Sequence, residues 1–196
     1  MVGVGAGGFA STLEFSDATP DADIQQYSVA ASAGYRFSHR LSVRLTAGAI
    51  LGGELETVDR TFDVGPGFLL SGSVSRRWDI GRWFLAGTLS AGVSRTTTEE
   101  AGVADAPSVE LIASDARVAA LFGTTVADRV SPYVLARGFG GPVFWSIDGE
   151  DSTGTDAHHY QLGAGGSVAL PANVSAQIDV SFLGERSLSA GAAVAF

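Results

Sequence analysis

The segment from residue 148 to residue 159, DGEDSTGTDAHH, concentrates the side chains of this chain that are able to ligate a metal ion or to move protons. It holds four carboxylates and two histidines. Such groups suit either a calcium site or an Asp–His pair for acid–base chemistry. The spacing does not match a calcium loop, so we favour a solvated acidic link and assign no catalytic residue and no metal ligand. Divalent-cation binding stays open as the alternative.

A glycine motif near the N-terminus has the spacing of a dinucleotide-binding loop. Gly3, Gly5 and Gly8 read G-x-G-x-x-G, and Asp23 follows at a distance suited to a ribose contact. That loop needs a strand before it and a helix after it. Here only two residues precede the motif, and FASTLEF continues in strict alternation. We therefore expect wall residues of a strand and no cofactor.

Charged residues also interrupt the apolar segments, always on the polar side of the alternation. They are Arg36, Arg44, Arg117, Arg137, Asp63, Asp115 and Asp179. Charges enclosed by a protein must pair or be hydrated, and the planar guanidinium can hold two carboxylates at once. A salt-bridged structural plug is the interpretation we favour. A narrow, anion-biased pore is the alternative, because many small residues share the same polar side.

The elements that carry these residues alternate with period two, as β-strands do. In LSVRLTAGAIL, for example, Leu41, Val43 and Leu45 alternate with Ser42 and Arg44. The pattern predicts ten strands, at residues 2–15, 24–37, 41–54, 62–77, 82–95, 109–126, 132–146, 159–170, 174–183 and 187–196. No segment has a helical period.

The connections between these strands alternate in length. Short turns are expected at 38–40, 78–81, 127–131 and 171–173, and longer polar links at 16–23, 55–61, 96–108, 147–158 and, more briefly, 184–187. In an up-and-down meander all short turns then lie at one end and all longer links at the other. Of the 21 acidic residues, 14 lie in or beside the longer links. This rhythm is typical of membrane β-barrels.

Lipid is a better environment than a soluble core for the apolar side of these strands. The opposite side is mostly Gly, Ser, Ala and Thr, where a water-facing exterior would carry Lys and Glu. Aromatic residues also gather near the strand ends, as in the two interfacial girdles of a membrane barrel. The predicted girdles are Tyr35, Phe37, Trp78, Trp83, Tyr133 and Phe196 at the short turns, and Phe15, Phe62, Phe144, Trp145 and Tyr160 at the links.

Composition narrows the class further. The chain has 196 residues, which suits a single domain spanning 1–196, and it contains no cysteine. Its net charge of −9 argues against a nucleic-acid partner. No apolar run approaches the ~20 residues of a transmembrane helix.

The C-terminal residues SAGAAVAF resemble the insertion signal of Gram-negative outer-membrane β-barrel proteins. Ser189, Gly191, Val194 and Phe196 match its polar, glycine, apolar and final aromatic positions. The resemblance implies recognition by the barrel-assembly machinery, pairing of the last strand with the first, and periplasmic termini. It does not identify a subfamily.

The expected fold is an all-β, closed, antiparallel up-and-down transmembrane barrel of about ten strands. The expected function is non-enzymatic: a porin-like narrow pore or a structural barrel in contact with outer-membrane lipid and lipopolysaccharide. One alternative is a surface enzyme, because omptin-type proteases resemble this chain in having ten strands and lipid A hydrolases are also barrels. His39, His158 and His159 offer little support for it. Another alternative is a platform that docks a protein partner through the long links.

Overall fold

The computed structural model describes residues 1–16, 19–37, 40–147 and 149–196. In this part of the chain all named elements are strands, and no helix is long and apolar enough to cross a membrane. The strands are β1 (Val2–Phe15), β2 (Ala22–Arg36), β3 (Leu41–Thr57), β4 (Thr61–Val64), β5 (Gly67–Ile80), β6 (Trp83–Glu100), β7 (Val109–Thr124), β8 (Val130–Gly140), β9 (Val143–Ile147), β10 (Glu150–Asp156), β11 (Tyr160–Leu170), β12 (Val174–Gly184) and β13 (Arg186–Val194).

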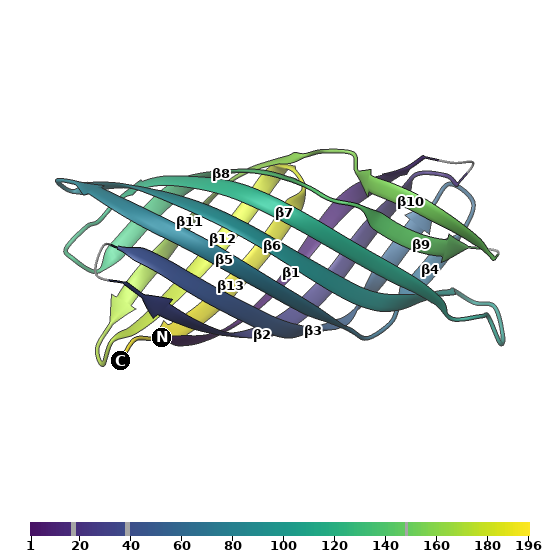
Figure 1. Ribbon diagram of the computed structural model, residues 1–196, viewed down its shortest axis with the longest axis horizontal. Helices are drawn as coiled ribbons and strands as arrows, with labels where there is room; N and C mark the ends of the chain where they lie inside the picture. The colour runs from purple at the N-terminus through teal and green to yellow at the C-terminus, as the bar shows by residue number, and fades with distance from the viewer. Residues whose placement is uncertain (17–18, 38–39, 148) are drawn as a thin grey trace.

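Ten strands close into a ring at the end of the molecule that carries both termini (Figure 1). In order around the wall they are β1, β2, β3, β5, β6, β7, β8, β11, β12 and β13, and β13 returns to β1. The closing pairs run from Val2 opposite Val194 to Ala10 opposite Arg186. The predicted closed antiparallel barrel is confirmed. We call this part the wide section.

The opposite end of the barrel is narrower. Its ring has eight strands, in the order β1, β2, β3, β4, β6, β7, β9 and β10. Here β10 pairs with β9 on one side and with Leu13–Phe15 of β1 on the other. The β12–β13 hairpin ends at Glu185 and does not extend into this eight-stranded ring, so the wall has two strands fewer here. We call this part the narrow section; β4, β9 and β10 mark it in Figure 1.

Two predicted strands, 62–77 and 132–146, are each divided at a Gly-Pro step, because proline has no backbone N–H to donate to a neighbouring strand. Gly65–Pro66 separates β4 from β5, and Gly141–Pro142 separates β8 from β9. The wall stays bonded there: Gly65 N donates to Thr97 O at 2.8 Å, and Ser114 N donates to Pro142 O at 3.0 Å.

The predicted link at 147–158 is wrong, because residues 150–156 form β10 and complete the narrow ring. Neighbouring strands also run further than predicted: β3 reaches Thr57 and β6 reaches Glu100. Carboxylates assigned to links therefore stand on the strand walls, among them Glu56 and Glu99.

The two sections have opposite polarity. In the wide section large apolar side chains cover the exterior: Leu45, Leu89 and Val118 are 64%, 62% and 61% exposed. A continuous apolar exterior of this size is unfavourable in water and suits lipid. In the narrow section the apolar side chains are buried inside, and carboxylates such as Glu54 and Asp63 face outward.

A local irregularity on β3 shifts its alternation by one residue between the two sections. The β2–β3 register shifts where Tyr27 pairs with Gly52 and Ser28 with Ile50, which leaves Leu51 as an extra residue. An extra residue moves every later side chain to the other face. Leu55, which uninterrupted alternation from Leu45 would place outside, is consequently inside and 0% exposed.

The aromatic girdle predicted at the links is wrong for three of its five members. Phe15, Phe62 and Trp145 are buried within the narrow section, with ring centroids 5.6 Å apart for Phe15–Trp145 and 5.0 Å for Phe62–Trp145. Phe144 and Tyr160 are exposed. At the short-turn end the exposed members of the girdle are Tyr35, Phe37, Trp78, Trp83 and Phe196.

Candidate functional site

Arg117 is the centre of the polar interior. It lies on β7 two residues beyond Asp115, and both face inward. Its Nε donates to Asp115 Oδ2, while Nη1 and Nη2 donate to the Glu185 carboxylate at 3.0 and 3.3 Å. The guanidinium also lies 4.8 Å from the centre of the Phe139 ring. Arg117 is thus held by two carboxylates and an aromatic face.

The contacts continue from Glu185 to the neighbouring strands. Gln161 on β11 donates from Nε2 to Glu185 Oε1 at 3.1 Å and to Ser187 Oγ at 2.8 Å. Arg137 on β8 donates from Nη1 to Gln161 Oε1 at 2.8 Å. We call Asp115, Arg117, Arg137, Gln161 and Glu185 the buried polar network. Its two arginines and two carboxylates balance in charge, which offsets part of their desolvation cost.

Glu185 and Gln161 were not among the sequence candidates. Glu185 belongs to the short link GERS and Gln161 is an uncharged residue of a strand, so neither stands out by type. Glu185 turns inward because the β12–β13 hairpin ends where the narrow section begins. The local sequence does not reveal where this hairpin ends relative to the other strands.

The other predicted interior residues occupy separate places. Tyr133 on β8 donates from its hydroxyl to Asp179 Oδ1 at 2.7 Å. Arg44 on β3 lines a cavity in the wide section, with its Nη2 3.7 Å from Met1 Sδ. Arg36 is the last residue of β2 and is exposed at the rim.

Asp63 differs from the expectation of an interior position. It lies on β4 between Phe62 and Val64, which are buried, and its own side chain is exposed. The Gly65–Pro66 step shifts the alternation by one residue between β5 and β4, and this places Asp63 outside. On the exterior it stands opposite Glu54 of β3 and Glu99 of β6.

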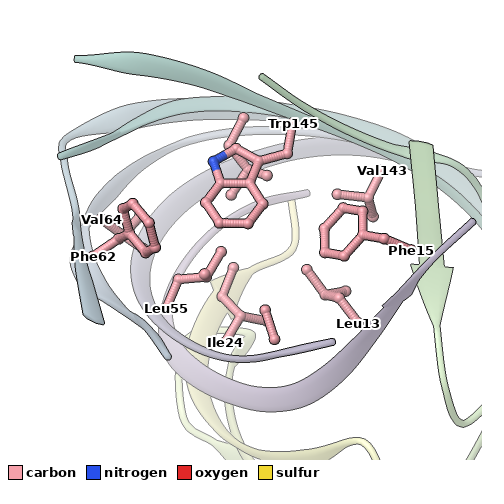
Figure 2. Packing of buried hydrophobic residues seen from close by; sticks show 10 residues of the cluster. Leu13, Phe15, Ile24, Leu55, Phe62, Val64, Val143 and Trp145 are labelled. Atoms are coloured by element: carbon pink, nitrogen blue, oxygen red, sulfur yellow. The ribbon is translucent and has the colours of Figure 1, made fainter. Parts of the chain in front are cut away.

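An apolar cluster fills the narrow section on the link side of the buried polar network. Its members are Leu13, Phe15, Ala22, Ile24, Leu55, Phe62, Val64, Leu111, Val143 and Trp145. Figure 2 shows side chains from several strands pointing to the middle of the barrel. Trp145 is 1% exposed and donates from Nε1 to Thr98 Oγ1 at 2.9 Å. An eight-stranded ring is narrow enough for side chains to fill.

Two cavities lie in the interior. One, of about 290 Å³, reaches from the apolar cluster to Arg117 and Glu185. The other, also about 290 Å³, is lined by Arg44 and by small residues of the wide section such as Gly5 and Ser32. Both touch Ser28 and Leu69. The wide lumen therefore has space, whereas the narrow section is packed.

The described part of the acidic segment, residues 149–159, does not bring its carboxylates and histidines together as a metal site. Asp151 accepts from Ser146 Oγ at 2.8 Å and Asp156 from Ser11 Oγ at 2.7 Å, so both carboxylates are tied to the wall. His158 and His159 are exposed. Asp148 and His39 lie outside the described residues. No group of three or more His, Asp or Glu side chains in the described ranges is arranged to hold a metal ion.

Gly3, Gly5 and Gly8 lie on β1, which pairs with β2 and β13 along the motif. A strand follows, where a dinucleotide site would need a helix. The residues of the insertion signal lie on or beyond β13: Ser189, Gly191 and Val194 in the strand, and Phe196 after it. Phe196 is 92% exposed.

No family model and no curated protein matches the chain. Solved structures match over its whole length. The translocator domain of the autotransporter NalP from Neisseria meningitidis has a TM-score of 0.54 and 13% identity, covering 100% of this chain and 88% of that one. The transport unit of the autotransporter AIDA-I from Escherichia coli has a TM-score of 0.52 and 9% identity, covering 100% and 90%. Neisserial surface protein A has a TM-score of 0.49 and 12% identity, covering 100% of this chain and 97% of that one.

At these identities the likeness is one of fold, and the first two structures carry it. The fold of these two structures agrees with the closed ring of antiparallel strands and with the apolar exterior of the wide section in this chain. The chain has the fold of the small β-barrels of Gram-negative outer membranes.

Proposed function

We propose that this chain is an integral outer-membrane protein that acts as a closed barrel rather than as a through-pore. The wide section is embedded in lipid, and the narrow section stands above it on the cell surface. The single observation that carries this proposal is the apolar cluster, which packs the interior of the narrow section around Trp145. Water and ions cross such a filled core poorly, because desolvated charge is costly there.

The proposed orientation has the termini and short turns in the periplasm. It is supported by the likeness of Ser189, Gly191, Val194 and Phe196 to the insertion signal, which also implies the barrel-assembly machinery as a transient partner. The carboxylates on the exterior of the narrow section then face the outer surface, next to lipopolysaccharide. Protease accessibility of the 101–108 link in intact cells is the direct check on this orientation.

The lumen of the wide section is the strongest support for the competing pore function. Arg44 and the small residues around it line a cavity of about 290 Å³. A pore would need a continuous path from this cavity past Arg117, Glu185 and the apolar cluster. The Arg117–Glu185 pair and the apolar cluster each narrow that path, which favours the closed barrel.

Planar-bilayer recordings separate the two functions. Insertion is first verified by heat-modifiable gel migration and β-type circular dichroism. The inserted wild-type chain is expected to give no steady conductance, and Trp145→Ala, which removes the largest buried side chain of the cluster, is the variant expected to leak. Steady wild-type channels whose ion selectivity changes in Arg44→Ala or Arg117→Ala would instead support the pore.

A docking role is the second candidate, and one observation favours it. Asp63 on β4 stands directly opposite Glu54 of β3 on one side and Glu99 of β6 on the other, and all three are exposed. Adjacent like charges on a sheet destabilise it unless something screens them. A basic partner surface would do so. The triple variant Glu54→Gln/Asp63→Asn/Glu99→Gln should then be more stable alone and should lose binding of an oligo-lysine peptide in a salt-sensitive assay.

A further inference from the structure

The exterior of the β5–β6 hairpin carries two arginine–tryptophan pairs at the short-turn end. The Arg76 guanidinium carbon lies 5.2 Å from the centre of the Trp78 ring, and that of Arg82 lies 5.3 Å from the centre of the Trp83 ring. Trp83 in turn stacks on Phe122 of β7, with centroids 5.5 Å apart and planes at 6°. Both arginines are therefore supported by fixed aromatic surfaces.

The strand register places these pairs on one outward face. Trp78 is opposite Leu85, and Leu85 is opposite Phe122 on the next strand. Gly87, opposite Arg76, has no side chain, and the Trp78 ring covers it: a Cβ at Gly87 would lie 3.5 Å from that ring. The result is a basic aromatic surface made of Arg76, Trp78, Arg82, Trp83 and Phe122.

The charge of this surface is not balanced by the protein. Among the described residues, neither Arg76 nor Arg82 has an ion-pair partner. The carboxylate nearest in sequence, Asp79, alternates to the inner face and is bonded to Arg77, at 2.7 Å, and to Arg40. The basic aromatic surface thus presents two guanidinium groups whose partner must come from outside the chain.

The surroundings identify that partner. On the same outward face of β5, Phe68, Leu70 and Val74 are exposed and belong to the lipid-facing exterior of the wide section. Arg76 interrupts this apolar column after Val74, with Trp78 and the exposed Ile80 beyond it and Arg82 in the adjoining turn; we place this end of the hairpin at the level of the lipid headgroups. Arginine binds phosphate through paired N–H groups, and tryptophan rings favour the same interfacial layer.

We propose that the basic aromatic surface binds the phosphate of an anionic phospholipid in the periplasmic leaflet; this rests on the proposed membrane embedding and orientation. Arg76 and Arg82 contact the phosphate oxygens, and Trp78 and Trp83 pack against the adjoining glycerol and acyl carbons. Continuity with the lipid-facing exterior favours a lipid over a soluble protein. Basic residues near a membrane surface each strengthen attraction to anionic lipid about fivefold.

Bromolipid quenching of tryptophan fluorescence tests the proposal on the intact chain. The protein is folded into phosphatidylcholine vesicles that contain either brominated phosphatidylglycerol or, as the reference, the same fraction of brominated phosphatidylcholine. Trp78 and Trp83 report on lipid at the surface, and Trp145 is enclosed in the apolar cluster. Enrichment of brominated phosphatidylglycerol of about fivefold or more is expected.

The variant Arg76→Gln/Arg82→Gln keeps both reporter tryptophans and should bring that enrichment close to one. The control Arg60→Gln/Arg95→Gln changes the net charge equally at the other end of the barrel and should retain it. Equal quenching by the two lipids, or enrichment that persists in Arg76→Gln/Arg82→Gln, overturns the proposal. Failure of the wild type to insert, seen as absent heat-modifiable migration, refutes the membrane embedding instead.

Discussion

Arg117 and Glu185 face each other across the barrel interior, joined by N–H···O bonds of 3.0 and 3.3 Å. Arg117 lies on β7, and Glu185 lies at the tip of the β12–β13 hairpin; β8 and β11 stand between them in the wall. The pair therefore ties the tip of the short hairpin to a distant strand. It does so at the level where the ten-stranded ring gives way to eight strands.

Glu185→Gln should destabilise the folded barrel, because it leaves the Arg117 charge short of a carboxylate in an enclosed site. Removing one partner of a buried ion pair costs about 3–5 kcal/mol. Arg117 is only partly buried and keeps Asp115, and Gln keeps the shape of Glu185, so a loss below that range is expected. Urea unfolding from lipid vesicles measures it. Glu14→Gln, an exposed carboxylate on β1 opposite the uncharged Thr155, is the matched control and should change stability little.

The double variant Arg117→Met/Glu185→Gln sharpens this prediction. Asp115 also bonds Arg117 and loses that partner in Arg117→Met, so the informative quantity is a double-mutant cycle: Glu185→Gln should cost less stability in the Arg117→Met background than in the wild type. If Glu185→Gln costs as much without Arg117 as with it, Glu185 acts in some other way than by pairing with Arg117.

Thr98→Val should destabilise the narrow section through Trp145. The indole N–H would lose its acceptor, Thr98 Oγ1, in a fully buried place. An unsatisfied buried donor costs about 1–3 kcal/mol. Trp145→Phe removes that donor, so Thr98→Val should cost less in the Trp145→Phe background. Equal costs in both backgrounds, measured by urea titration, would exclude the bond as the cause.

Leu89→Arg tests the lipid-facing orientation of the wide section. Leu89 is on the exposed side of β6, and a charge placed there enters the hydrocarbon layer. The expected loss is about 2–4 kcal/mol near the bilayer midplane. Gln25→Arg, on the exterior of the narrow section, is the control and should be nearly neutral. Similar small effects at both positions would argue that the wide section faces water.

Gly184→Ala should impair closure of the β12–β13 hairpin. Gly184 has φ +73, and a Cβ there would lie 1.8 Å from the Tyr160 carbonyl oxygen. Gly81, in the β5–β6 turn, also has positive φ, +61, but has open space around it. Gly81→Ala should therefore cost only about 1–2 kcal/mol of backbone strain. The folded fraction on a heat-modifiability gel should fall much further for Gly184→Ala than for Gly81→Ala.

Local sequence patterns are enough to predict the architecture of the wide section. Period-two alternation in 41–50 and 174–183, the short turns and the C-terminal motif are local features, and each reports directly on which side of a strand is apolar. They predicted a closed antiparallel barrel with its apolar side outward, and the structure agrees. Arg117 and Asp115 also follow from this alternation, since no irregularity intervenes within β7.

The arrangement of the narrow section depends on strand register and on contacts between strands far apart in the sequence. The extra residue at Leu51 and the Gly65–Pro66 step each shift the alternation by one position, so Leu55 turns inward and Asp63 outward; composition alone does not reveal such a shift. The partner of Glu185 depends on where the β12–β13 hairpin ends relative to β7, a distance set by strand register across the whole ring. Local patterns indicate which face of a strand a side chain takes, whereas strand register and strand length decide which residues that side chain contacts.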